Sequence, residues 1–550
     1  IGHMSEVWYF STYLSTLFGH MLTGFPCGDI FAGINIYTGL VISAGVIISY
    51  FFLTRGFNAD RKLVFAGELL MMSLCYSPTV IVYNHLSNFL VLLSVICIYY
   101  AMTGENKFLF IAAGSILGIN VFVRFSNLTQ AAFILSVWSY IYFNREKYKG
   151  KVFKKIVGDT LYCLAGYLGS ITVMLIYMGV KYGVDRYING ILGLFSMSSD
   201  AEYYTFSYML KDMVISYLKG MHRILYPVFF GIAACGISCL ISHRIKDERK
   251  NKRFRTVVLS LCILIMIGIM IWRKLLQFDF YHYAVVYFTA AALLDIVIVI
   301  SIYNIISKDR AVDEKMLSVF VLLQILLTSV GSNTGISVTM NSMYLSAPYL
   351  LLEMSRLIHK SKERAANDVK AENTLIMMTV LSAFVAVLWF QSFFFGISYV
   401  YEEGNNTGRR DYYVDGNRVL NNIKLSEERA DCIQNISDYV NENGLNKNEV
   451  IVYGFAPAIG YYLDMIPVMT TWPDLASYSV EEMKGDMTRI KNSLDKGEMN
   501  YPVIIIGDLL KTSGIAEEPA KTRMITDFME EYDYSQVYEY DVFEIWRRVE

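Results

Sequence analysis

Long apolar runs constrain this chain more than any other feature of its sequence. Between residues 34 and 398, stretches of about 16–25 mostly apolar residues follow one another, separated by short polar connections. A run of this length crosses a hydrocarbon layer of ~30 Å as a helix, in which every backbone group is hydrogen-bonded internally. Charged residues make up 18% of the chain, whereas soluble domains carry roughly 25%. The sequence therefore predicts a mostly α, polytopic bundle of transmembrane helices.

Twelve candidate spans can be read from these runs, at residues 34–54, 63–83, 87–102, 108–123, 128–143, 156–180, 226–242, 256–272, 284–303, 316–331, 336–355 and 374–398. The connections between them alternate in charge. One set contains 25 Lys and Arg, at 55–62, 103–107, 144–155, 243–255, 304–315 and 356–373. The other set contains eight, at 1–33, 84–86, 124–127, 181–225, 273–283 and 332–335. The positive-inside rule places the first set in the cytoplasm.

This topology puts residue 1 and the segment after the last span outside the cytoplasm. Because no signal peptide is recognisable at the N-terminus, we expect one span upstream of residue 1, which gives thirteen in the intact protein and makes this chain N-terminally truncated. Residues 1–33 are then the remnant of the first outer loop. The aromatic-rich segment 4–24 predicts an interfacial helix there. The transmembrane bundle occupies 34–399 and includes a long outer loop at 181–225, within which residues 206–222 can form an interfacial helix with a solvated polar face.

Residues 400–550 form a separate acidic unit, with 15 Lys and Arg against 28 Asp and Glu, whereas residues 1–399 carry 33 against 22. The short apolar runs Val450–Gly454 and Val503–Gly507 are typical of strands buried on both faces of a parallel sheet. Helices are expected after Ser426 and over 520–532, followed by a hairpin. The sequence thus predicts a C-terminal extracytoplasmic α/β domain. No basic stripe suited to nucleic acid occurs in either part.

The predicted outer side carries most of the candidate binding residues. Arg124 lies in a tight turn where its guanidinium can bind phosphate with two parallel hydrogen bonds, or reach lipid headgroups as a snorkelling side chain. His222 and Arg223 adjoin the seventh span, and Asn84 lies in another outer turn. Asp295, inside a span, can serve as an ion relay or as a hydrogen-bonded buried carboxyl.

Cofactor motifs are missing from the sequence. No His/Cys cluster has metal-ligand spacing, and no Gly-rich loop suits a nucleotide phosphate. We therefore expect no cofactor, and leave open a divalent cation. Cys27 and Cys432 are the two cysteines outside the predicted spans, and a disulfide between them is also left open.

Five short segments stand out at the predicted outer turns and in the tail, namely Tyr83–Ser87, Val123–Asn127, Gly331–Gly335, Val452–Gly454 and Trp472–Tyr478. Together they resemble the GT-C class of membrane glycosyltransferases, near glycosyltransferase family 39, which includes protein O-mannosyltransferase and aminoarabinose-transferase relatives. An extracytoplasmic domain behind about thirteen spans also fits that class.

The resemblance implies sugar transfer from a polyprenyl-phosphate-linked donor to a glycan, lipid or protein acceptor at the outer face of the cell membrane. It also implies an acidic catalytic residue in the first outer loop. Glu6 and Asp29 are the acids of that remnant, but neither stands in the expected motif, so the catalytic base is expected upstream of residue 1. Arg124, His222, Arg223 and Asn84 become candidates for binding the donor.

Two other functions stay open. Twelve spans and Asp295 would suit a secondary transporter, although transporters of this size usually keep both ends in the cytoplasm. The chain could also be a non-catalytic envelope protein derived from a glycosyltransferase.

Overall fold

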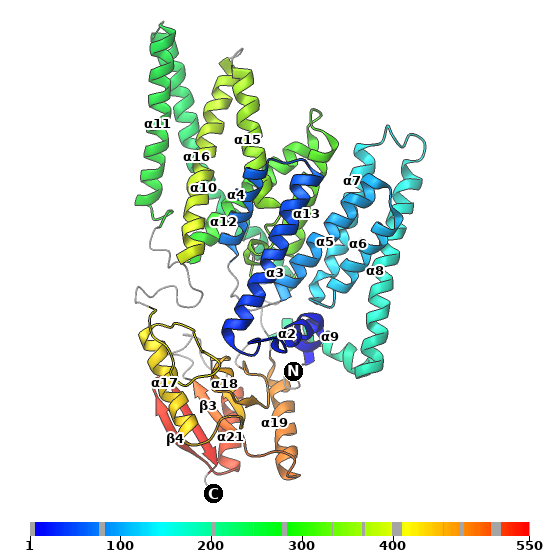
Figure 1. Ribbon diagram of the computed structural model, residues 1–550, viewed down its shortest axis with the longest axis vertical. Helices are drawn as coiled ribbons and strands as arrows, with labels where there is room; N and C mark the ends of the chain where they lie inside the picture. The colour runs from blue at the N-terminus through cyan, green and yellow to red at the C-terminus, as the bar shows by residue number, and fades with distance from the viewer. Residues whose placement is uncertain are drawn as a thin grey trace.

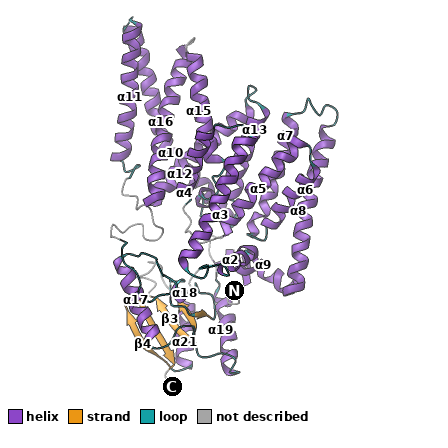
Figure 2. Ribbon diagram, viewed as in Figure 1, coloured by secondary structure: helices purple, strands orange, loops and turns teal. Residues whose placement is uncertain are grey.

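The computed structural model describes residues 6–75, 83–200, 205–245, 247–277, 283–332, 334–365, 369–398, 410–454, 456–473, 478–507 and 519–548. The described residues up to Ser398 are mostly helical (Figures 1 and 2). The elements are α1 (Glu6–Ser11), α2 (Tyr13–Thr23), α3 (Phe31–Phe51), the π-helical turn η1 (Phe52–Gly56), α4 (Arg61–Leu74), α5 (Tyr83–Gly104), α6 (Lys107–Asn120), the 3-10 helix η2 (Phe125–Ile134), α7 (Leu135–Phe143), α8 (Val152–Tyr182), α9 (Val184–Asp200), α10 (Phe206–Arg244), α11 (Glu248–Trp272), α12 (Tyr283–Ile306), α13 (Val312–Thr328), α14 (Ser337–Met340), α15 (Ser346–Ala365) and α16 (Val369–Ser398).

The mostly helical, membrane-type architecture is confirmed. Among the described residues, seven helices are long and apolar enough to cross a membrane, at Phe31–Gly56, Tyr83–Gly104, Val152–Tyr182, Phe206–Arg244, Arg249–Trp272, Val285–Ile306 and Ala371–Ser398. The remaining predicted runs fall on shorter helices, namely α4, α6, η2 with α7, α13, and α14 with α15. The total of twelve membrane spans therefore stays a prediction.

The two predicted sets of connections lie at opposite ends of the bundle. The connections from α7 to α8 and from α10 to α11 are at the top in Figure 1, whereas α2, α9 and the C-terminal domain are at the bottom. The range 181–225, expected to be a loop, is largely helical, because α9 fills 184–200 and α10 begins at Phe206. A single helix of 39 residues thus joins this outer segment to the predicted seventh span.

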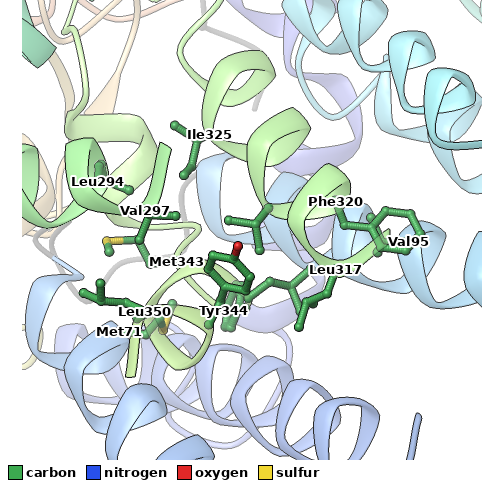
Figure 3. Close-up of a cluster of buried hydrophobic side chains, with 14 of the residues drawn as sticks. Met71, Val95, Leu294, Val297, Leu317, Phe320, Ile325, Met343, Tyr344 and Leu350 are labelled. Carbon is green, nitrogen blue, oxygen red and sulfur yellow. The ribbon is translucent and has the colours of Figure 1, made fainter. Parts of the chain in front are cut away.

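The core of the bundle gathers around the segment that enters α15. Met343, Tyr344 and Leu345 are fully buried there, and apolar side chains of α4, α5, α12 and α13 surround them (Figure 3). The backbones of α4 and α15 also approach closely, because a Cβ at Gly67 would stand 2.2 Å from the Cα of Pro348. Close packing of this kind holds the helices in fixed register.

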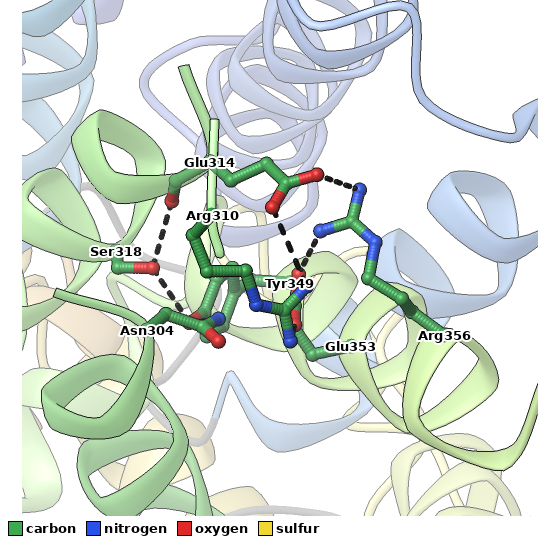
Figure 4. A network of polar contacts seen from close by, with 7 residues as sticks. All are labelled: Asn304, Arg310, Glu314, Ser318, Tyr349, Glu353 and Arg356. Atoms are coloured by element: carbon green, nitrogen blue, oxygen red, sulfur yellow. Dashed lines mark hydrogen bonds and ion pairs between the residues drawn. The ribbon is translucent and has the colours of Figure 1, made fainter. Parts of the chain in front are cut away.

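A network of charges joins α13 and α15 (Figure 4). The Arg310 guanidinium pairs with Glu353 at 3.1 Å and with Glu314 at 3.4 Å. Arg356 pairs with the same two carboxylates, at 2.7 Å and 2.9 Å respectively. Arg310 and Glu353 have side chains only 5% exposed, so their charges depend on the partners in this network for compensation.

The C-terminal domain is an α/β unit whose predicted elements are confirmed. Its elements are α17 (Glu427–Glu442), β1 (Glu449–Tyr453), α18 (Ile459–Tyr462), β2 (Ile466–Pro467), α19 (Val480–Asp495), β3 (Val503–Gly507), α21 (Pro519–Glu531), β4 (Tyr534–Tyr540) and β5 (Phe543–Arg548). The sheet order is β2-β1-β3-β5-β4, with β1 parallel to β3 and the terminal hairpin β4–β5 antiparallel. Side chains of α17 pack on one face, and those of α19 and α21 on the other.

This domain is tied to the segment that precedes α3. Arg418 forms ion pairs with Asp29 and, at 3.0 Å, with Asp464. The Tyr461 hydroxyl donates to the backbone oxygen of Asp29 at 2.8 Å, and the Phe31 amide donates to the Val419 carbonyl at 3.1 Å. These two carboxylates raise the pKa of Arg418, so its charge is permanent at this contact. Cys27 and Cys432 are both free thiols, the first exposed and the second buried.

Candidate functional site

Three of the segments that carried the resemblance meet at Arg124. Arg124 precedes η2 in extended conformation, after α6 has ended at Asn120. Its Nη2 atom donates to the Gly331 carbonyl at 3.0 Å, and its guanidinium carbon lies 5.1 Å from the centre of the Tyr83 ring. The side chain is half-buried, and the Gly331 carbonyl is the one hydrogen-bond acceptor of its guanidinium among the described residues, so the fork keeps further N–H donors for a ligand.

A buried amide network holds Arg124's turn in place. The Asn127 side-chain amide donates to Ser87 Oγ at 2.7 Å and to the Asn120 carbonyl at 3.0 Å. Gln130 donates to Asn127 at 3.0 Å and accepts from the Asn120 side chain at 2.7 Å. All four side chains are 5% exposed or less. The Asn120 side-chain oxygen is the one side-chain polar atom of these four residues that has no hydrogen-bond partner among the described residues. The hydrogen bonds that are made join α5, α6 and η2, so Ser87 and Asn127 position η2 against α5 and α6.

The turn of residues 331–335 forms the next part of the site. Gly331 and Gly335 adopt φ values of +74° and +55°, in the region that favours glycine. A Cβ at Gly331 would stand 2.8 Å from the Cβ of Ser126, so this turn packs directly on the start of η2. Ser332 and Thr334 share a hydroxyl hydrogen bond of 2.8 Å within it.

The opposite side of this turn meets α10 and α12. A Cβ built at Gly335 would stand 2.1 Å from Ser216 Oγ, 2.8 Å from the Tyr287 hydroxyl and 3.0 Å from Asp212 Oδ2. The Tyr287 hydroxyl donates to Ser216 Oγ at 2.7 Å, and Ser216 donates to the backbone oxygen of Asp212 at 2.6 Å. The same short turn therefore contacts a guanidinium at one end and a carboxylate at the other.

Sequence reasoning missed Asp212, Ser216 and Tyr287. The i, i+4 spacing of Asp212 and Ser216 on a helix continuous with a span is a usable signal. The sequence predicted a helix at 206–222 only as an interfacial segment, because the polar residues before 226 separate it from the apolar run of the seventh span, whereas α10 runs without a break from Phe206 to Arg244. Nothing local in the sequence predicts that Tyr287 reaches them.

Two unsatisfied polar atoms occur in the segments that meet at Arg124. Asn84 Oδ1 and Ser126 Oγ are buried and have no hydrogen-bond partner among the residues the structure describes. Buried polar atoms in folded proteins are normally paired, so these two atoms are open to a polar ligand. Asn84, predicted as a binding residue, is thus adjacent to the site through its neighbour Tyr83.

His222 and Arg223 lie in a different environment from Arg124. Arg223 is 2% exposed and sits between α10 and α12, where it donates to Thr289 Oγ1 at 2.7 Å and to the Val285 carbonyl at 3.1 Å. Its guanidinium also lies 5.5 Å from the centre of the Phe288 ring. His222 is exposed, with its ring edge toward Phe288. Of the predicted cations, Arg124 is therefore the one held at the meeting of the outer turns.

The acids predicted as weak candidates for the catalytic base have other surroundings. Asp29 is paired with Arg418 at the contact with the C-terminal domain. Glu6 is the first residue of α1, and its side chain lies outside the described residues. Asp295 is buried in α12, and its Oδ2 atom has no hydrogen-bond partner in the described part of the chain. Within the tail segment Trp472–Tyr478, residues 474–477 also lie outside the described residues.

The described residues contain no group of three or more His, Cys, Asp and Glu side chains arranged to hold a metal ion. No protein-family model matches the chain, and no curated protein matches its sequence. The arrangement of Arg124, Gly331, Gly335 and Asp212 is therefore the basis for the function proposed below.

Proposed function

We propose that the protein is a membrane glycosyltransferase of GT-C type, which moves a sugar from a polyprenyl-phosphate-linked donor to an acceptor at the outer face of the cell membrane. The observation that carries the proposal is the convergence of three outer turns on Arg124. A cation fixed by the Gly331 carbonyl and the Tyr83 ring supplies what the leaving group of this reaction needs.

The chemistry of the donor explains why a guanidinium would be used. As the bond between the sugar and the phosphate breaks, negative charge grows on the phosphate oxygens. A preorganised donor group at that point stabilises the transition state more than the ground state. Arg124 is anchored through one N–H, so little reorganisation is needed when its other N–H groups bind the phosphate.

The placement of the site fits a lipid-linked substrate. In the proposed topology, twelve spans precede an extracytoplasmic C-terminal domain, and the turns at 124–127 and 331–335 open on the outer leaflet. The polyprenyl chain would remain in the lipid while its phosphate reaches Arg124. The C-terminal domain, tied to the start of α3 through Arg418 and Asp29, would orient a glycan, lipid or protein acceptor.

Affinity measurements on the purified full chain test the donor assignment. Short-chain polyprenyl phosphates linked to glucose or mannose, presented in detergent micelles, serve as probes. Arg124→Ala should weaken binding by ~1.5–3 kcal/mol, the range for a hydrogen bond to a charged group, which is about 10- to 150-fold in Kd. Arg124→Lys should restore only part of the affinity, because an ammonium keeps the charge and loses the fork.

Arg273→Ala is the matched control, since Arg273 is an exposed cation on the same predicted outer side without contact to these turns among the described residues. Its affinity should equal that of the wild type. Equal donor affinity in the wild type and in Arg124→Ala would refute the assignment, and full replacement by Lys would indicate contact with headgroups only.

A further inference from the structure

Asp212 stands at the far end of the turn that Arg124 contacts. It lies in the second turn of α10, is half-buried, and brings its Oδ2 atom against Gly335 together with Ser216 and Tyr287. Ser216 is fully buried, and its hydroxyl receives a hydrogen bond from Tyr287. The Asp212 carboxylate therefore lies beside two polar side chains, one from α10 and one from α12.

The separation between cation and carboxylate is limited by the chain itself. Gly331 accepts from Arg124 and Gly335 contacts Asp212. The Cα atoms of these two glycines are four residue steps apart and cannot be separated by more than about 14 Å even in a fully extended chain, and each charged group lies one contact beyond its glycine. This upper limit is compatible with both groups acting on one sugar. No ion pair neutralises the Asp212 carboxylate among the described residues, whereas Asp29 is paired with Arg418.

We infer that Asp212 is the general base of an acceptor site, which Ser216 and Tyr287 help to form and which takes a hydroxyl-bearing acceptor. This inference rests on the proposed function. A hydroxyl is a weak nucleophile at neutral pH, and a positioned carboxylate that accepts its proton accelerates transfer. A base within this chain also replaces the one expected upstream of residue 1.

The proposed transfer moves one proton and exchanges one bond at the sugar. The Asp212 carboxylate accepts the acceptor's proton as the acceptor oxygen forms a bond to the anomeric carbon of the sugar. The bond from that carbon to the phosphate oxygen breaks, and its electron pair leaves with the polyprenyl phosphate. Arg124 binds the additional negative charge on that phosphate. Cation and base thus act on opposite sides of the same carbon.

The test compares donor binding with transfer in Asp212→Asn. The purified full chain receives polyprenyl-phosphate glucose or mannose, with glycerol as a probe acceptor, and released polyprenyl phosphate is measured. We expect donor affinity within twofold of the wild type and a transfer rate about 100- to 10,000-fold lower. Asp185→Asn, at an exposed acid of α9, is the matched control and should transfer at the wild-type rate.

The outcomes separate this inference from the proposal on which it rests. If the wild type neither binds nor consumes the donor, the proposed function fails. If the wild type transfers and Asp212→Asn transfers equally fast, or if Asp29→Asn alone abolishes transfer, the function stands and Asp212 is not the base. Asp212→Glu should fold and keep measurable transfer. Failure of both Asp212 variants to fold would overturn the inference, because the carboxylate would then hold the helix contact.

Discussion

Replacing Gly335 by alanine tests whether the turn at 331–335 is packed as closely as the site requires. The new Cβ would stand 2.1 Å from Ser216 Oγ and 2.8 Å from the Tyr287 hydroxyl, distances that force one side to move. The residue also has a φ of +55°, which costs a non-glycine residue about 1–2 kcal/mol. Overpacking in a rigid environment costs about 1–3 kcal/mol. Together they predict a loss of about 2–5 kcal/mol.

The assay is thermal unfolding of the purified full chain in detergent, followed by thiol exposure or scattering. At about 2 °C per kcal/mol, the apparent Tm should fall by about 4–10 °C, and transfer should fall further because Asp212 is displaced. Gly236→Ala is the matched control, since Gly236 lies on α10 and its Cβ would meet open space. In a helix that change stabilises by up to ~1 kcal/mol.

An unchanged Tm for Gly335→Ala would refute the reasoning. It would mean that the turn does not pack against α10 and α12, and the bound on the separation of Arg124 from Asp212 would disappear with it.

Three further predictions concern other parts of the molecule. Glu353→Ala should destabilise the bundle by up to ~3–5 kcal/mol in thermal unfolding, because it removes the nearer of the two carboxylates that pair with buried Arg310 and leaves only Glu314, at 3.4 Å. Arg356→Ala, whose side chain is 42% exposed, should cost less than ~1 kcal/mol, and equal losses would contradict the network in Figure 4. Maleimide at pH 7.5 should modify exposed Cys27 and leave Cys432 intact, as judged by peptide mapping. Burial and the nearby Asp541 raise the pKa of Cys432 to about 12, and the thiolate is the reactive form, so modification of Cys432 in the folded protein would contradict the prediction. Asp295→Asn should change the transfer rate by less than about threefold, since Asp295 is a buried α12 residue with no hydrogen bond or ion pair to Arg124 or Asp212 among the described residues. Loss of an ion-coupled uptake activity in liposomes would instead favour a transporter.

Much of the fold could be predicted because its signals are local. Apolar runs predicted the long helices, and the runs ending at Gly454 and Gly507 predicted the parallel pair of strands. A helix starting at residue 206 was predicted only as an interfacial segment; its continuity with the seventh span was not predicted, because the polar residues from Lys211 to Arg223 interrupt the apolar pattern. In the structure one face of that stretch is buried, through Ser216 and Gly220.

The site was only partly predictable for a related reason. Arg124 stood out because it is a cation on the predicted outer side, where cations are scarce. Its contact with Gly331 joins residues 207 positions apart, and the approach of Asp212 to Gly335 depends on how α10 and α12 pack. Arg223 had the same local signal as Arg124, yet it is enclosed between two helices. Charge pattern thus selects candidates, and packing decides which of them can meet a ligand.

Photo-crosslinking of the donor tests the central claim most directly. A short-chain polyprenyl-phosphate-linked sugar that carries a diazirine next to the phosphate is irradiated with the full chain in liposomes, and the labelled peptides are sequenced. The proposal predicts label within 124–127 or 331–335, suppressed by excess unmodified donor and lost in Arg124→Ala. Label confined to other helices, or label in these turns that excess donor does not suppress, would contradict it.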